Sequence, residues 1–282
     1  MSRSSRPCRH SSEAGPEAEV APDGSGRPEV SAYWLSSVAY RRAWRLQQAV
    51  VAAVRAGRQP PSLLLLEHPH VFTIGRRGDG STLLWSEEEC RRRGIEVVWT
   101  DRGGDVTYHG PGQLVGYPIV DMVGLGTDVL RFIRGLERSL VSYLATLGLE
   151  AEPGGKGLTG VWSQGAKVAA IGIKLTDQVT SHGFALNLTT DLDIFNRGIV
   201  PCGLVGRRAT SVLELTGLRV EVAEAARAYA PHFGRQFGIG IRWGDPAELW
   251  ALLGAASEPE EMGERVDDVG SVPMVNPGRI GR

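Results

Sequence analysis

Three extended segments in the middle of the chain constrain its fold more than any other feature of the sequence. These segments are residues 159–163, 167–174 and 181–188, and they are rich in apolar and β-branched side chains. Short polar or glycine-containing runs separate them. Such short connections join antiparallel strands, because a parallel pair needs a crossover of about a dozen residues or more. Helical periodicity appears on both sides, at residues 38–55, 127–147 and 222–237. We therefore predict an α+β domain with a mixed or antiparallel sheet and flanking helices, rather than a doubly wound parallel sheet.

Shorter elements are predicted around these segments. Ser86 is typical of a helix N-cap, and the helix it begins should stop at Gly94. Thr127 is the expected cap of the helix that ends near residue 147. The density of glycine and proline predicts a loop over residues 102–113. Further strands are expected at residues 63–67, 71–74, 95–99 and 114–120, and short helices at residues 191–195, 211–215 and 246–253.

The two ends of the chain differ in composition from the rest. Residues 1–29 are rich in Ser, Pro, Gly, Glu and Arg and lack apolar periodicity, so they are predicted to be a disordered N-terminal extension. Residues 246–282 are predicted to be a largely disordered C-terminal extension. One catalytic domain is therefore expected over residues 30–245.

Composition excludes several classes of protein. The 31 Lys and Arg balance 32 Asp and Glu, so no basic excess is present to hold nucleic acid. No apolar run approaches the roughly 18 residues of a membrane span. The odd number of cysteines, Cys8, Cys90 and Cys202, cannot make a disulfide framework, and the expected location is the cytoplasm. No His/Cys cluster has the spacing of a metal site.

Residues 102–113 are the first candidate for function. Four glycines there let the backbone approach a ligand closely and expose N–H donors. The alternative is a hairpin loop that happens to hold a histidine. The candidate binding residues in this segment are Arg102, Gly103, Gly104, Asp105, Val106, Thr107, Tyr108 and His109.

Cys202 and Lys167 are candidates for covalent chemistry. Cys202 lies between Pro201 and Gly203, on a turn rather than in a core element; it is either a nucleophile with a lowered pKa or a small packing residue. Lysine occurs at only three positions, and Lys167 lies within a small apolar strand. Desolvation lowers the pKa of a buried lysine and suits it to proton transfer. The alternative is a lysine at a strand end that extends to water.

Residues 181–188 form the last candidate segment. Gly183 and Ala185 are small residues beside apolar ones, which suits the wall of a hydrophobic pocket. His182 is either a base or a structural hydrogen-bonding group. No phosphate-binding glycine motif of the Walker type is present.

These segments together resemble the octanoyltransferases, also called lipoyl transferases. The resemblance covers residues 38–243. Several separate motifs occur in the family's order, namely Glu67-His68-Pro69 with Thr73-Ile74-Gly75-Arg76, residues 102–113, residues 167–172, residues 181–187, and Pro201-Cys202-Gly203.

The resemblance implies a fold and a set of site residues. The fold would be that of the biotin/lipoate protein ligase catalytic domain. Cys202 would be the nucleophile that carries the acyl group as a thioester, and Lys167 would activate it. The substrate pocket would comprise residues 102–109 together with Ala170, Ile171, Gly172, Gly183, Phe184 and Ala185.

The resemblance also implies a reaction and its partners. An octanoyl or lipoyl group would pass from acyl carrier protein to Cys202, and then to a lysine of apo lipoyl domains in 2-oxoacid dehydrogenase complexes and of the glycine cleavage H protein. The acyl group would arrive on the carrier's phosphopantetheine arm, with no cofactor and no metal. The enzyme would act as a monomer, without nucleic acid or membrane.

Two other functions fit parts of the sequence. The same fold could serve an ATP-dependent lipoate or biotin protein ligase, although adenylation needs no thiol. The second alternative is a protein that binds lipoyl domains or carriers without catalysing a reaction. The basic clusters 76–77, 91–93 and 207–208 are either docking sites for an acidic carrier or ordinary solvated surface.

Overall fold

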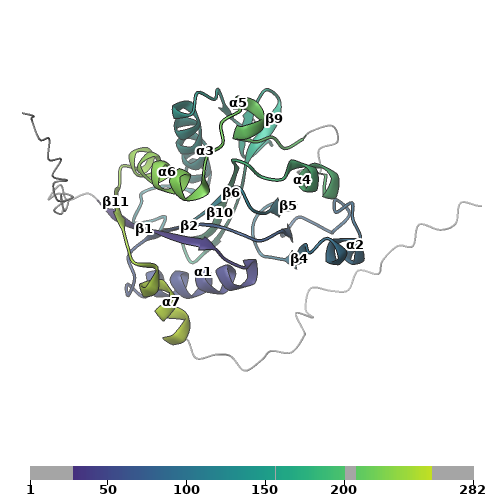
Figure 1. Ribbon diagram of the computed structural model, residues 1–282. Coiled ribbons are helices and arrows are strands. Elements are labelled where there is room, and N and C mark those ends of the chain that lie inside the picture. Colours follow the sequence, from purple (N-terminus) through teal and green to yellow (C-terminus); the bar gives the residue numbers. More distant parts are fainter. Residues whose placement is uncertain (1–27, 156, 201–207, 256–282) are drawn as a thin grey trace, which may run out of the picture.

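An eight-stranded mixed sheet forms the centre of the molecule (Figure 1). The computed structural model describes residues 28–155, 157–200 and 208–255. The strand order is β11-β1-β2-β6-β10-β9-β8-β7, in which β1 runs parallel to both neighbours and the other pairs are antiparallel. The predicted α+β class with a mixed sheet is confirmed. The strands are β1 (Glu29–Ser37), β2 (Ser62–Glu67), β6 (Gln113–Ile119), β7 (Glu152–Pro153), β8 (Val161–Ser163), β9 (Ala166–Thr176), β10 (Val179–Asn187) and β11 (Gly240–Trp243).

The predicted antiparallel segments in the middle of the chain become β8, β9 and β10. The turn between β9 and β10 consists of Asp177 and Gln178, both with positive φ, at 45° and 68°. Two positive φ values in a two-residue turn match the right-handed twist of the flanking strands. This turn sets the register that aligns Ala170 with Ala185 and Gly172 with Gly183.

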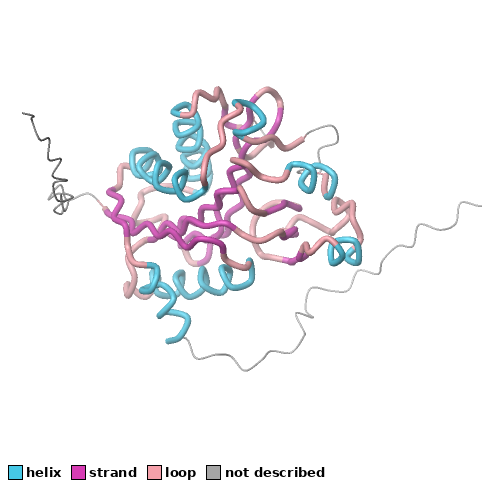
Figure 2. The backbone as a smooth tube through the Cα atoms, viewed as in Figure 1, coloured by secondary structure: helices cyan, strands magenta, loops and turns pink. Residues whose placement is uncertain are grey.

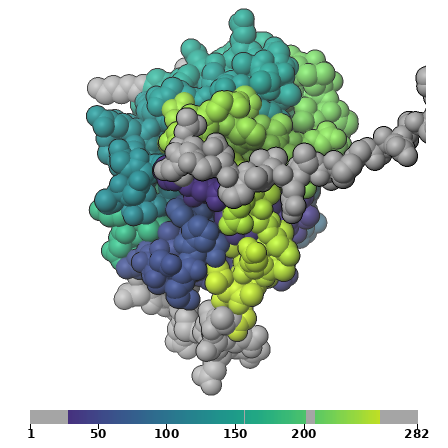
Figure 3. Space-filling model, turned by 90° about the vertical axis from the view of Figure 1, so that its left-hand side faces the viewer, coloured from purple at the N-terminus to yellow at the C-terminus, as the bar shows by residue number. Residues whose placement is uncertain are grey.

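Helices cover both faces of the sheet (Figures 1 and 2). Helices α3 (Val129–Thr146) and α6 (Val222–Phe237) pack on one face, and α1 (Tyr40–Arg55) and α7 (Pro246–Ala255) pack together on the other (Figure 3). Leu63 and Leu65 of β2 contact the first pair, whereas Leu64 and Leu66 contact the second. The run of four leucines is therefore explained by a strand that is buried on both faces.

A second, three-stranded sheet lies beside the first. Its order is β4 (Glu96–Trp99), β3 (Val71–Ile74) and β5 (Val106–His109), with α2 (Glu87–Arg92) alongside. The predicted loop over residues 102–113 is wrong at residues 106–109, because β5 pairs with β3 and the glycines lie only in the flanking turns. The Ser86 cap is confirmed, since its side chain accepts the Glu89 N–H.

A few other boundaries differ from the prediction. The cap of α3 is Asp128 rather than Thr127, because the Asp128 carboxylate accepts the Arg131 N–H at 2.8 Å. The strands β1, β7 and β11 have no counterpart in the prediction, because their partners are distant or short. The remaining helices are α4 (Leu192–Gly198) and α5 (Val212–Thr216). The proposed terminal extensions lie mostly outside the described residues and stay predictions.

His68 connects three parts of the core at the end of β2. It is fully buried; its Nδ1–H donates to the carbonyl of Val38 at 2.6 Å, and its Nε2 accepts from the Tyr117 hydroxyl at 2.7 Å. Burial lowers the pKa of His68 to about 4, although the bond to Val38 opposes the shift. His68 is therefore neutral in the folded protein at neutral pH.

This burial predicts an acid-dependent loss of stability. The unfolded chain takes up a proton at His68 near pH 6.5 and the folded chain only near pH 4, so the unfolding free energy falls across that window, by about 3 kcal/mol. Urea unfolding between pH 8 and pH 4 measures it. The His68→Gln variant should be less stable than wild type at pH 8, and the difference should shrink toward pH 4. Parallel curves for the two proteins would contradict the prediction.

Candidate active site

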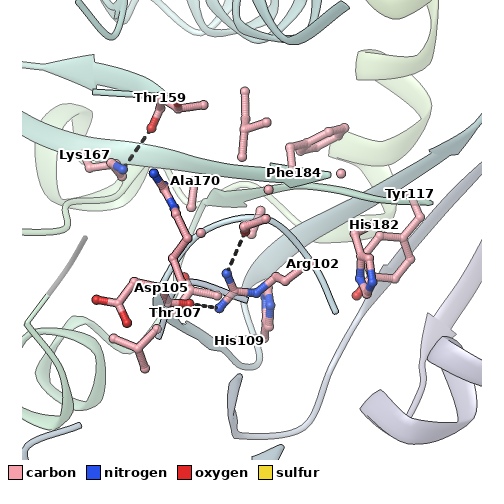
Figure 4. A pocket seen from close by; sticks show the side chains of 18 of the residues that line it. Arg102, Asp105, Thr107, His109, Tyr117, Thr159, Lys167, Ala170, His182 and Phe184 are labelled. Carbon is pink, nitrogen blue, oxygen red and sulfur yellow. Dashed lines mark hydrogen bonds between the residues drawn. The ribbon is translucent and has the colours of Figure 1, made fainter. Parts of the chain in front are cut away.

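A pocket of about 330 Å³ lies over β9 and β10, beneath the segment that leads into β5 (Figure 4). The turn before β8 closes one end with Gly157 and Thr159. Most of the residues predicted from the sequence line this pocket: Arg102, Gly103, Gly104, Asp105, Val106, Thr107, His109, Lys167, Ala170, Ile171, Gly172, Gly183, Phe184 and Ala185.

Two predicted site residues are not among the lining residues. Tyr108 points into the core beside β5, where it packs on Phe72 and Phe195, and its hydroxyl hydrogen-bonds His70 Nδ1 at 2.7 Å. Strand alternation explains this, because Thr107 and His109 take the opposite face. Cys202 lies outside the described residues.

Backbone crosses backbone closely at the roof of the pocket. The Gly103 N–H donates to the carbonyl of Ile173 at 3.0 Å. A Cβ atom on Gly172 would lie 2.5 Å from the Gly103 carbonyl oxygen, and one on Gly183 would lie 2.1 Å from the Gly116 carbonyl oxygen. Glycine at residue 172 therefore lets the roof lie on the sheet, and glycine at residue 183 lets β10 lie close to β6.

Arg102 shapes this roof from within. Its side chain is buried, and its guanidinium donates to the Thr73 hydroxyl and carbonyl at 3.0 and 2.6 Å. It also donates to the carbonyls of Gly103 and Asp105 at 3.0 and 2.7 Å. The planar fork of Arg102 thus ties β3 to the glycine turn.

Lys167 lies at the end of the pocket near Thr159, with 4% of its surface exposed. Its Nζ donates to the Thr159 carbonyl at 3.0 Å and lies 4.9 Å from the centre of the Trp162 ring. Its main chain pairs with residues 208–210, because Lys167 N donates to Arg208 O and Thr210 N donates to Lys167 O, each at 2.9 Å. The lysine is thus fixed at both its backbone and its side-chain nitrogen.

His182 and Tyr117 lie across the pocket from Lys167 (Figure 4). His182 Nε2–H donates to Asp101 at 2.8 Å, and Lys174 Nζ contacts the other carboxylate oxygen at 2.6 Å. Partial burial raises the pKa of Asp101, but these two bonds outweigh it and hold the pKa below its ordinary value. Burial lowers the pKa of His182, against the bond to Asp101, so this histidine is neutral at neutral pH. Asp101 therefore fastens the roof to β9 and β10.

A chain of side chains connects the roof to the strand of Lys167. His109 Nδ1–H donates to Gln113 Oε1 at 2.8 Å, and Gln113 Nε2 donates to Asn187 Oδ1 at 2.9 Å. Asn187 in turn donates to the carbonyl of Thr210, whose N–H binds the Lys167 carbonyl. All of these groups are buried, so the two sides of the pocket hold a fixed relative position.

Several of these residues escaped the sequence analysis. Tyr40, Asp101, Tyr117 and Thr159 belong to segments that carry no motif of their own. Only the register of β9 and β10 brings Lys174 and His182 together with Asp101. Within residues 28–155, 157–200 and 208–255 there is no group of three or more side chains suited to a metal ion. No helix in that part of the chain is long and apolar enough to cross a membrane.

The close contact at Gly172 predicts a local effect of added bulk. Gly172→Ala should lift the roof segment 101–104, at a cost of about 1–3 kcal/mol in stability. Hydrogen exchange at residues 101–105 should become faster. Gly240→Ala is the control, since a Cβ there meets nothing nearer than 3.7 Å. Unchanged protection of the roof in Gly172→Ala would contradict this account.

Comparison with known proteins gives a consistent family. Residues 39–234 match the lipoyl protein ligase A/B catalytic domain. A protein named octanoyltransferase from Caldicellulosiruptor saccharolyticus is 40% identical over 234 residues, which is 83% of this chain and 99% of that protein. The octanoyltransferase of Geobacter sulfurreducens is 47% identical over 199 residues, 71% of this chain and 81% of that protein.

Solved structures agree on the fold. Lipoate-protein ligase A bound with ATP superposes with a TM-score of 0.67 at 18% identity, covering 80% of this chain and 93% of that one. A bipartite lipoate protein ligase from Thermoplasma acidophilum gives a TM-score of 0.62 at 20% identity, covering 80% and 91%. At these identities the likeness shows the fold alone. The sequence relatives decide the family, and the chain belongs to the octanoyltransferases, a group of acyltransferases with the lipoyl protein ligase A/B catalytic domain.

Proposed function

We propose that this protein transfers an octanoyl or lipoyl group from acyl carrier protein to a lysine of a lipoyl domain, through a thioester on Cys202. The observation that carries the proposal is the fixed position of Lys167 in the pocket. This residue is buried in the wall of the pocket, its Nζ donates a hydrogen bond to the Thr159 carbonyl, and its main chain pairs with residues that follow the Cys202 segment. Covalent acyl transfer needs an oriented base that can take the proton of a cysteine thiol, and Lys167 can supply it.

The fixed ends of the segment 201–207 support this role for Cys202. Before the segment, Val200 N donates to the Thr82 carbonyl at 2.9 Å, and the Thr82 hydroxyl donates to Asp105 in the pocket wall at 3.0 Å. After it, Arg208 pairs with Lys167. Val200 and Arg208, which flank the segment, are therefore both connected by hydrogen bonds to residues that line the pocket.

The proposed first step forms the acyl-enzyme. The Cys202 thiol gives its proton to the neutral amine of Lys167, and the thiolate attacks the thioester carbonyl. The bond to the carrier's sulfur then breaks, and the departing thiolate takes the proton from the Lys167 ammonium. Thioester replaces thioester, so no input of ATP is required.

The proposed second step forms the amide. The amine of the acceptor lysine attacks the acyl-enzyme and Cys202 leaves as a thiolate. Lys167 takes the proton released by the amine and returns it to the Cys202 sulfur. The enzyme thereby returns to its starting state without a cofactor.

The pocket suits an aliphatic chain. Its volume of about 330 Å³ lies at the small end of the usual range of roughly 300–1,000 Å³ for ligand sites. Ala170, Ile171, Phe184 and Ala185 supply an apolar lining along β9 and β10. Each buried methylene of the chain contributes about 0.8 kcal/mol. An acyl group is therefore the ligand that we infer, delivered on the phosphopantetheine arm.

We infer that the acceptors are the lipoyl domains of 2-oxoacid dehydrogenase complexes and the glycine cleavage H protein. The family supports carriers and lipoyl domains as substrates in general. We also infer that the enzyme acts in the cytoplasm, which fits the sparse cysteines of the sequence, and that it is a monomer.

Replacing Cys202 tests the proposed nucleophile. Cys202→Ser incubated with octanoyl carrier should show no thioester adduct by intact-protein mass spectrometry. Lys167→Met should form the adduct about 100-fold more slowly, because the thiol loses its base. Cys90→Ser is the control, since Cys90 lies on α2 and is buried against the core. An adduct that survives in Cys202→Ser would refute the assignment.

The proposed transferase and an ATP-dependent ligase can be distinguished by the substrates that they use. Octanoyl carrier should label an apo lipoyl domain without ATP, whereas free octanoate with ATP should give no labelling. Labelling by free octanoate with ATP but not by octanoyl carrier would identify a ligase, if the Cys202→Ser variant keeps the same activity. Binding of both partners without any transfer would identify the non-catalytic alternative.

The three basic clusters that could receive an acidic carrier differ in whether their arginines already have acidic partners. Arg92 and Arg93 contact Glu89, and Arg208 pairs with Glu214 at 2.8 Å. Arg77 is exposed and lines the pocket, and within the described residues its guanidinium has no hydrogen bond or ion pair. We therefore infer that the carrier docks over residues 76–77.

Charge reversal tests this docking site. Arg77→Glu should lower the association rate of octanoyl carrier about tenfold at low salt, and the loss should fade as salt rises. Arg58→Glu is an equal charge change at an exposed arginine outside the pocket, and it should leave the rate unchanged. Equal effects of the two variants, measured by stopped-flow acylation, would remove the assignment.

A further inference from the structure

A buried carboxylate on α3 connects to Lys167 through a single peptide group. Glu137 Oε1 accepts the Gly160 N–H at 2.9 Å, and the Thr159 carbonyl accepts from Lys167 Nζ at 3.0 Å. The Thr159 carbonyl and the Gly160 N–H belong to the same peptide bond. We infer that Glu137 is a positioning residue that holds the Lys167 amine in place for proton transfer, an inference that rests on the proposed function.

Glu137 is an unusual side chain for the interior. None of its surface is exposed, although glutamate is rarely fully buried unless it is paired. Its second oxygen, Oε2, accepts from Arg134 Nη1 at 2.6 Å. Both oxygens are thus satisfied inside the protein, one by a cation and one by the backbone of the turn before β8.

The turn that receives these bonds is held at both of its ends. Arg134 Nη1 also donates to the Gly154 carbonyl at 2.6 Å, and Gly154 N donates to the Gly160 carbonyl at 2.8 Å. Gly160 has a φ of 123°, and a Cβ there would lie 2.5 Å from the Ala169 carbonyl oxygen. The turn is therefore pressed against β9 at a place that only glycine can occupy.

The geometry of the peptide bond transmits this restraint. A trans peptide is planar, and its N–H and C=O point in opposite directions. When Glu137 fixes the N–H of Gly160, the Thr159 carbonyl must point the other way, toward Lys167. The N–H of this peptide group thus binds the Glu137 carboxylate, and its carbonyl binds the Lys167 amine.

The inserted peptide also suits a lysine that changes its charge. A carbonyl oxygen accepts a hydrogen bond from an ammonium and from a neutral amine alike. A carboxylate in direct contact would instead favour the ammonium strongly. Glu137 can therefore orient Lys167 while leaving it able to accept and return a proton.

Substitutions at residue 137 test the inference by single-turnover acylation with octanoyl carrier. Glu137→Met keeps the volume but removes the acceptor, so acyl-enzyme formation should slow about 100-fold, as expected for a displaced catalytic group. Its KM for the carrier should stay unchanged. Glu137→Gln keeps an oxygen for the Gly160 N–H and should restore most of the rate.

A control on the same helix separates positioning from stability. Ser139→Ala removes a buried 2.8 Å bond between α3 and the Tyr229 hydroxyl, yet leaves the turn intact. It should lower the melting temperature without slowing acylation. If Glu137→Met does not fold, Arg134→Met removes the bonds to Glu137 Oε2 and to the Gly154 carbonyl from a side chain that is 34% exposed, and it should slow acylation in the same direction.

The outcomes distinguish this inference from the proposed function. Full activity of Glu137→Met beside an inactive Lys167→Met would overturn only the role of Glu137. Glu137→Gln as slow as Glu137→Met would also overturn it, because the acceptor would not be what matters. Full activity of Lys167→Met would overturn the proposed role of the lysine itself.

Discussion

The pocket depends on one contact in which the main chain of one segment lies directly on the main chain of another. Gly103 hydrogen-bonds Ile173, and Gly172 leaves room for the Gly103 carbonyl. This contact joins the segment that leads into the smaller sheet to the larger sheet and forms the roof of the pocket. Because the contact uses only backbone atoms, the side chains of β9 and β10 remain available to line the pocket.

Charged side chains near the pocket mainly form hydrogen bonds with other groups of the protein. Arg102 donates to three backbone carbonyls, Asp101 binds His182 and Lys174, and Glu137 binds a backbone N–H. Buried charges keep their ionisation at low cost only when such partners are preorganised. The result is a pocket whose wall residues are held in place by hydrogen bonds, with Lys167 oriented at one end. Rigid placement suits the proposed reaction, because its proton transfers require hydrogen-bonding distances.

The sequence was sufficient for much of the fold because the signals were local. The hairpin of β9 and β10, the Ser86 cap and helix α6 follow from turn residues and periodicity within short windows. Most candidate residues from the glycine-rich segment line the pocket, since glycine density marks close backbone approach. The strands β1 and β11 could not be predicted in this way. Their pairing joins residues more than two hundred positions apart, and neither has a clear alternating pattern.

The same limit applies to the site. Asp101 and Glu137 lie in segments without any distinguishing motif, and their importance comes from tertiary contacts with Lys174 and Gly160. Tyr108 shows the opposite error: it shares a motif with His109, yet strand alternation turns it into the core. A motif locates a segment, whereas the pleat of the strand decides which of its side chains face the ligand.

The parallel pairing of β11 with β1 has a consequence for how the protein is made. During synthesis β1 leaves the ribosome early, while its outer neighbour emerges only after residue 240. Until then one side of β1 presents unpaired N–H and C=O groups, the kind of edge that recruits strands from other chains. A truncated or stalled chain that ends before β11 therefore carries an aggregation hazard that the finished protein removes with its last four-residue strand.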